Sequence, residues 1–209
     1  LAVGYWLQVQ NGFIIGDSLA RVAASQSALF SREPHLAAIG FIFTPLTAMV
    51  QVPLIWAAPV FPVLAERALS ATIMSGLFMA GAVVQVFSVG ADRGLPRRYV
   101  VTIASLFALH PMIVFYGSNG MSEAPFVFFM TWAVRRLILW MVDDDVHHLI
   151  AAGGVAMGLA YLTRYDALAC IAAAGAVVAV TTYRRAPGPP RILRALLDLI
   201  IISGPGVLA

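Results

Sequence analysis

The stretch LSATIMSGLFMAGAVVQVFSVGA, residues 69–91, contains no charged side chain along its whole length. About 20 predominantly apolar residues are needed for a helix to cross the hydrocarbon core of a bilayer, so this stretch predicts a transmembrane helix. The whole chain is similar in character, with 61% hydrophobic residues, 11% charged residues and a mean hydropathy of +0.89. Ordinary soluble domains are roughly half apolar and a quarter charged. We therefore predict an all-α, polytopic transmembrane helical bundle.

Other apolar stretches flank this one, and together they predict a single transmembrane domain over residues 1–209. A long external loop, residues 16–68, follows the first span, and residues 69–209 hold about six further spans. The first and last spans are shorter than a membrane requires, so we interpret the chain as an N-terminal fragment of a larger protein. The candidate spans are Leu1 to Ile15, Leu69 to Ala91, Tyr99 to Tyr116, Ala124 to Val142, His148 to Leu162, Ala167 to Tyr183 and Ala195 to Ala209.

Residues 36–64 are apolar enough to span a membrane, but they contain four prolines. Prolines at this density would break a spanning helix repeatedly. Short amphipathic helices lying along the outer membrane interface are the better prediction for this segment. If residues 36–64 did span, Asp17 and Glu123 would lie on opposite sides of the membrane.

The distribution of arginine predicts the orientation of the chain. All thirteen basic residues are arginine, and nine of them fall in loops on one side of the predicted bundle, with four on the other. Because cytoplasmic loops are enriched in Lys and Arg, the side with nine is predicted to be cytoplasmic. Asp17, the turn at residues 117–123 and the turn at residues 164–166 then share the outer face. The net charge of +3 forms no continuous basic patch, so no nucleic acid partner is expected.

Asp17 is the first candidate functional residue. It lies in the turn Gly16-Asp17-Ser18, directly after the first apolar run, where a charged residue beside lipid is costly to retain without a use. One interpretation is a general base or a metal ligand at the outer mouth of the bundle. The other is a helix cap, in which Asp17 or Ser18 accepts a backbone N–H bond from a helix beginning at Leu19. Both roles are compatible.

Glu123 is the second acidic candidate, at the end of a glycine-containing turn and the start of a predicted helix. A carboxylate in a first helical turn is stabilised by the helix dipole, and Ser122 beside it is a suitable cap. The functional interpretation is that Glu123 faces Asp17 across an outer cavity. Two carboxylates on one side are compatible with a divalent cation, with Asp17 as a ligand, although no ligand spacing requires one.

Arg32 and His35 lie in the polar segment Ser31-Arg32-Glu33-Pro34-His35. Their side chains are able to hold a phosphate or a sugar hydroxyl. The alternative is a polar elbow between two interfacial helices, which Pro34 alone explains. Taken by itself, the segment favours the elbow.

Arg164 lies between two apolar runs, on the side predicted to be poor in arginine. A guanidinium at the membrane boundary is well suited to bind a lipid phosphate through two parallel hydrogen bonds. The alternatives are an internal pair with Asp166, or a side chain that extends its charge toward the interface.

An acidic run, Asp143 to Asp145, precedes His147 and His148. Its composition is that of a metal site. It follows two arginines on the side predicted to be cytoplasmic, however, and a solvated loop is the better prediction.

The order of the elements Gly16-Asp17, Pro34-His35, Thr44-Pro45-Leu46, Ser122-Glu123 and Arg164-Tyr165-Asp166 resembles the GT-C superfamily of integral-membrane glycosyltransferases. Within that superfamily the chain is similar to the bacterial members related to protein mannosyltransferases and aminoarabinose transferases. The resemblance covers nearly all of the chain.

The resemblance implies a multi-pass enzyme of the cell membrane that moves a sugar from a polyprenyl-phosphate donor to an acceptor glycan, lipid or protein at the extracytoplasmic face. Asp17 would deprotonate the acceptor or hold a divalent cation, and Glu123 would lie beside the acceptor. Arg164 would stabilise the departing lipid phosphate, where negative charge develops. Many relatives carry a paired Asp-Glu or Asp-x-Asp in the first loop, and here Asp17 is followed by Ser18. The substrate-binding residues expected in addition to Arg164 are Arg32, His35 and Asp166.

Two other functions are compatible with the sequence. In a polytopic transporter or lipid flippase, Asp17 and Arg164 would be substrate or proton-relay groups. Transporters commonly contain internal repeats, and none is visible here. The third function is a catalytically silent scaffold, which would differ from the enzyme in lacking an open cavity at the candidate residues.

Overall fold

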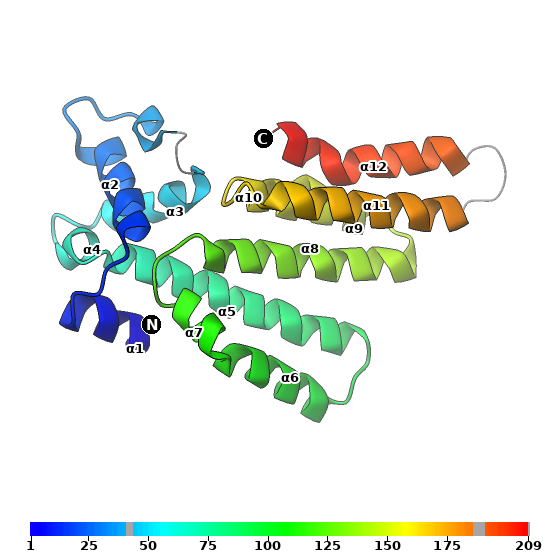
Figure 1. The fold of residues 1–209 in the computed structure, drawn as a ribbon, viewed down its shortest axis with the longest axis horizontal. Helices are drawn as coiled ribbons and strands as arrows, with labels where there is room; N and C mark the ends of the chain where they lie inside the picture. The colour runs from blue at the N-terminus through cyan, green and yellow to red at the C-terminus, as the bar shows by residue number, and fades with distance from the viewer. Residues whose placement is uncertain (41–43, 186–190, 209) are drawn as a thin grey trace. The chain divides into compact units, whose positions relative to one another are not determined.

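The computed structural model describes residues 1–40, 44–185 and 191–208, and every regular element among them is helical (Figure 1). This confirms the all-α class. Three of the described helices are long and apolar enough to cross a membrane, which supports a membrane location, while the polytopic arrangement and the side that each end faces stay predictions. These helices are α5 (Leu69–Asp92), α8 (Glu123–Asp143) and α11 (Ala167–Arg185).

The chain divides into two compact units, Leu1–Phe128 and Phe129–Ala209. The first unit contains α5 and, beside it, α6 (Arg97–Leu109) (Figure 1). Small residues permit the two helices to approach closely: a Cβ at Gly90 would lie 3.0 Å from the Val100 side chain. Gly94, with a φ of +69°, allows the turn between them.

The predicted span from Tyr99 to Tyr116 is interrupted at His110. Helix α6 ends at Leu109, and α7 (Pro111–Tyr116) begins after it. The residue before a proline is disfavoured in the helical conformation, and His110 accordingly has an extended ψ of 130°. Its Nδ1 accepts a hydrogen bond from the backbone N–H of Met112 at 3.3 Å, so His110 caps α7.

Short helices occur throughout the described parts of the predicted external loop, residues 16–40 and 44–68. At 1.5 Å per residue, the ten residues of α3 reach only about 15 Å, half the thickness of a hydrocarbon core of about 30 Å. Pro45 and Pro62 stand immediately before α3 and α4, positions where a proline does not break the helix. The location of these helices in a membrane interface stays a prediction. They are α2 (Gly16–Phe30), η2 (Leu36–Ile39), α3 (Leu46–Ile55) and α4 (Val63–Glu66).

The residues before α2 form two short helical pieces, α1 (Ala2–Tyr5) and the π-helical η1 (Trp6–Gln10), where the sequence predicted one truncated span. Gly4 lies against α5 and the turn after α7, because a Cβ there would overlap the Thr72 side chain of α5 and lie 2.7 Å from the carbonyl oxygen of Ser118. The core of the first unit is formed by residues of α2, α3, α4, the connections after α3 and α4, and the start of α5. It contains Val22, Ile55, Ala58, Leu64, Ala65, Ala68 and Ala71.

The second unit contains α8 from Phe129 onward and a hairpin in which α11 and α12 (Arg191–Leu208) lie side by side (Figure 1). The predicted span from His148 to Leu162 is a continuous helical stretch whose central part, η3, is π-helical. Helix α12 packs against both α11 and η3. The stretch consists of α9 (Val146–Leu149), η3 (Ile150–Met157) and α10 (Gly158–Tyr161).

Candidate functional site

Asp17 is exposed and lies in the first turn of α2. The helix begins at Gly16, with Ile15 as the preceding residue and no side-chain cap, and the backbone N–H of Leu19 already donates to the Ile15 carbonyl at 3.2 Å. The predicted alternative, in which Asp17 or Ser18 caps a helix starting at Leu19, is therefore wrong. The position instead gives the Asp17 carboxylate the stabilisation of a helix N-terminus.

One face of α2 carries buried polar side chains at one-turn spacing, Ser18, Arg21 and Ser25. Arg21 is only 5% exposed, and the Ser25 hydroxyl lies within 2.9 Å of the carbonyl oxygens of Arg21 and Ala48. A buried guanidinium in a membrane protein is costly and is retained where it has a use. Arg21 is thus a candidate that the sequence analysis missed, because it was treated only as a loop arginine; its spacing of four residues from Asp17 was the available signal.

The turn at residues 117–122 is held against α2 and α5. The backbone N–H of Met121 donates to Asn119 Oδ1 at 3.0 Å, and the Ser75 hydroxyl of α5 donates to the Met121 carbonyl at 3.3 Å. Gly120 has a φ of +76°, and a Cβ there would lie 2.8 Å from the Cβ of Ala71 and closer still to the Ser18 hydroxyl. Only glycine therefore fits this position without displacing the turn.

A hydrogen bond links this turn to α2. Arg21 Nη2 donates to the Ser122 hydroxyl at 3.3 Å, although the two residues are 101 positions apart in the sequence. Ser122 directly precedes Glu123, which is half-buried at the start of α8. The first unit thus brings the turn of α2 that carries Asp17 next to the turn that leads to Glu123. The functional roles of the two carboxylates stay predictions.

Three polar side-chain atoms near this turn are buried and have no hydrogen bond within the described residues: Ser18 Oγ, Asn119 Nδ2 and Gln8 Nε2. The carbonyl oxygen of the Gln8 side chain does have a partner, because Oε1 accepts a hydrogen bond from the Thr72 hydroxyl. An unsatisfied buried polar group costs about 1–3 kcal/mol, so it calls for an explanation in terms of strain or function. All three atoms are able to donate a hydrogen bond to an oxygen.

The segment that contains Arg32 and His35 forms an exposed elbow between α2 and η2. The carbonyl oxygen of Glu33 accepts from the Ser31 hydroxyl at 2.9 Å, and His35 Nδ1 lies 2.6 Å from the same oxygen. These local bonds match the elbow interpretation. Substrate binding by Arg32 and His35 stays a prediction.

Arg164 and Asp166 belong to the second unit and form a close ion pair. Arg164 Nε and Nη2 lie 2.8 and 2.7 Å from Asp166 Oδ2. The internal pair that was the alternative interpretation of Arg164 is therefore present. A phosphate that binds Arg164 would compete with the Asp166 carboxylate for the guanidinium.

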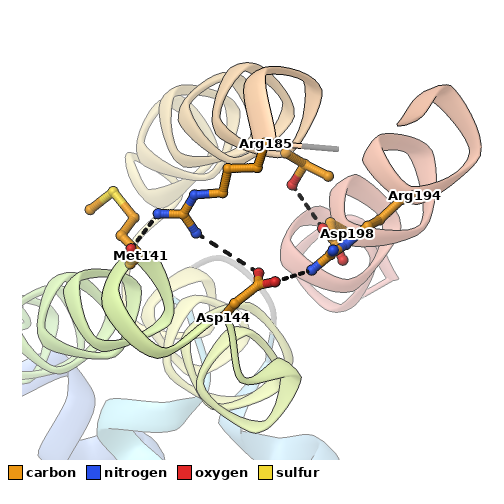
Figure 2. Close-up of polar contacts among 6 residues, drawn as sticks. Met141, Asp144, Arg185, Arg194 and Asp198 are labelled. Atoms are coloured by element: carbon orange, nitrogen blue, oxygen red, sulfur yellow. Dashed lines mark hydrogen bonds and ion pairs between the residues drawn. The ribbon is translucent and has the colours of Figure 1, made fainter. Parts of the chain in front are cut away.

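Asp144 and Asp145 form the short connection between α8 and α9, and Asp143 and Asp144 are exposed, which agrees with the predicted solvated loop. Asp144 also contacts α11 and α12 (Figure 2). Asp144 accepts a hydrogen bond from Arg194 of α12 at 2.6 Å, and Arg185 of α11 lies 3.8 Å away and also donates to the Met141 carbonyl. The bond to Asp144 raises the pKa of Arg194. Asp145 caps α9, and the backbone N–H of His147 lowers the pKa of its carboxyl group. Asp144 thus links the end of α11 to the start of α12, and Asp145 stabilises the start of α9.

Asp198 of α12 is buried, and its Oδ2 lies 3.9 Å from Nε of Arg194 (Figure 2). The Thr182 hydroxyl of α11 donates to the Asp198 carboxylate at 2.8 Å. Replacing Thr182 by valine keeps the shape and removes the donor, so we expect a loss of about 1–3 kcal/mol in the free energy of unfolding. Denaturant unfolding of the detergent-solubilised protein measures this loss of stability. Thr181→Val is the matched control and Thr182→Ser should restore stability; equal stability of Thr181→Val and Thr182→Val would show that the bond contributes nothing.

Among the described residues, the acidic and histidine side chains do not gather into a metal site. Across residues 1–40, 44–185 and 191–208, no three His, Cys, Asp or Glu side chains form a group that could hold a metal ion. The involvement of Asp17 in binding a divalent cation stays a prediction.

Comparison of the chain with protein-family models, with curated proteins and with solved structures found no match. The resemblance to the GT-C superfamily therefore rests on the motifs of the sequence alone.

Proposed function

We propose that this chain is part of a membrane glycosyltransferase that moves a sugar from a polyprenyl-phosphate donor to an acceptor at the outer face of the cell membrane. The observation that carries the proposal is the hydrogen bond from Arg21 to Ser122. It joins the helical turn after Asp17 to the residue before Glu123, so two carboxylates and a buried arginine belong to one region of the first unit. Such a grouping is typical of sites for proton transfer to or from a substrate.

Asp17 is the proposed general base. Its exposure in the first turn of α2 allows a substrate hydroxyl to approach it. As Asp17 takes the proton, the acceptor oxygen forms a bond to the anomeric carbon of the sugar. The bond from that carbon to the phosphate oxygen breaks, and the phosphate leaves with the lipid and both electrons of the bond.

The other residues have supporting roles in this proposal. Glu123 orients the acceptor, and Arg21 fixes the turn before Glu123 through Ser122. The buried donors Ser18 Oγ and Asn119 Nδ2 are candidates to bind hydroxyl oxygens of a substrate. Arg164 belongs to the second unit, and its role in stabilising the charge on the departing phosphate stays a prediction from the resemblance.

The test is a transfer assay with the full-length protein in lipid vesicles and a panel of radiolabelled polyprenyl-phosphate sugars. Label is expected to move from the lipid to an acceptor. The same vesicles report transbilayer movement of the labelled lipid, which the transporter or flippase function requires. Movement of intact lipid without transfer would favour that alternative and contradict the proposal.

A further inference from the structure

The connection between α3 and α4, residues 56–62, exposes large apolar side chains. We name residues 56–61 the apolar tip. Trp56 is 73% exposed, Val60 74% and Phe61 59%. Such exposure in three neighbouring large residues is unfavourable in water and marks a surface that contacts an apolar partner.

Buried residues next to and within the apolar tip attach it to the core of the first unit. Ile55 is fully buried and Ala58 nearly so, and both belong to the core of the first unit. Within the tip, the backbone N–H of Phe61 donates to the Ala57 carbonyl at 3.0 Å. The backbone of the tip is therefore held in place, so the exposure of Trp56, Val60 and Phe61 follows from the fold.

Charge and position indicate that the partner is lipid. No acidic residue, lysine or arginine occurs from Pro34 to Ala65, on either side of the tip. Only the short helix α4 separates the tip from α5. Helix α5 has 24 residues and measures about 36 Å, which exceeds a hydrocarbon core of about 30 Å, so its first turn reaches the membrane interface.

We propose that the apolar tip inserts Trp56, Val60 and Phe61 into the bilayer, at the boundary between headgroups and acyl chains near the start of α5. Tryptophan is enriched at this depth because its ring is apolar and its N–H group is polar. Insertion anchors α3 and α4 to the membrane surface at a second point besides α5. This inference requires only that α5 spans the membrane and is independent of any glycosyltransferase activity.

The test uses the full-length protein in vesicles, with native cysteines replaced by serine and a spin label attached at Val60→Cys. Power-saturation spectroscopy compares collisions with oxygen, which concentrates in lipid, and with a water-soluble nickel complex. We expect the label at position 60 to favour oxygen. A label at Arg67→Cys, an exposed position after α4, is the matched control and should favour nickel.

Phe61→Cys repeats the measurement at a second position, in case one variant does not fold. Nickel accessibility at position 60 or 61 equal to that at Arg67→Cys would overturn the proposal, because the tip would then lie in water. Low accessibility to both reagents would overturn it as well, since the tip would be covered by protein.

Discussion

Replacing Asp17 by asparagine is expected to abolish sugar transfer, with a fall in turnover on the order of 10²–10⁴-fold, the usual contribution of a general base. The amide has the size and shape of the carboxylate but does not accept a proton at neutral pH. Asp17 is exposed in the first turn of α2 and caps no helix, so the substitution removes no packing contact from the core. Folding and membrane insertion should therefore remain intact.

The measurement is the initial rate of transfer in vesicles, with equal amounts of each variant verified by size-exclusion elution. Glu33→Gln is the matched control, because Glu33 is also exposed and contributes only its backbone carbonyl to the elbow. It should transfer sugar at the wild-type rate. Near-normal turnover of Asp17→Asn would show that another group takes the proton, with Glu123 as the next candidate.

The helices were predictable from the sequence where length and composition decide them. The stretch from Leu69 to Ala91 becomes α5, Leu69–Asp92, because an uncharged run of this length has few alternatives to a helix. The predicted span from Tyr99 to Tyr116 is divided at His110, since hydropathy takes no account of the lost helical conformation before Pro111.

The candidate site was only partly predictable, for a physical reason that differs between residues. Asp17 and Glu123 attract attention because carboxylates are rare in apolar sequence. The burial of Arg21 depends on a turn 101 residues away, and no local pattern reveals that contact. The contacts of Asp144 were equally hidden in the local sequence, because its partners Arg185 and Arg194 lie about 40 to 50 residues later in the chain. The loop sequence alone predicted only an exposed acidic segment.

Gly153 is expected to be indispensable for the packing of the second unit. A Cβ at this position of η3 would lie 2.6 Å from the carbonyl oxygen of Ile202 and 2.7 Å from that of Ile201. These are backbone atoms of α12, so no side-chain rotation relieves the overlap, and α12 must move away from η3. Overpacking of this kind costs roughly 1–3 kcal/mol, and we expect Gly153→Ala to lose stability at the upper end of that range.

The neighbouring glycine separates this packing effect from the helix-forming tendency of alanine. A Cβ at Gly154 would meet only the Ile150 side chain, at an ordinary contact distance of 3.5 Å. Alanine favours a helix over glycine by about 1 kcal/mol, so Gly154→Ala should be neutral or stabilising. Denaturant unfolding of both variants in detergent then yields opposite signs at adjacent positions. Equal stability of the two would mean that α12 does not pack against η3 through Gly153, because propensity alone would then account for both substitutions.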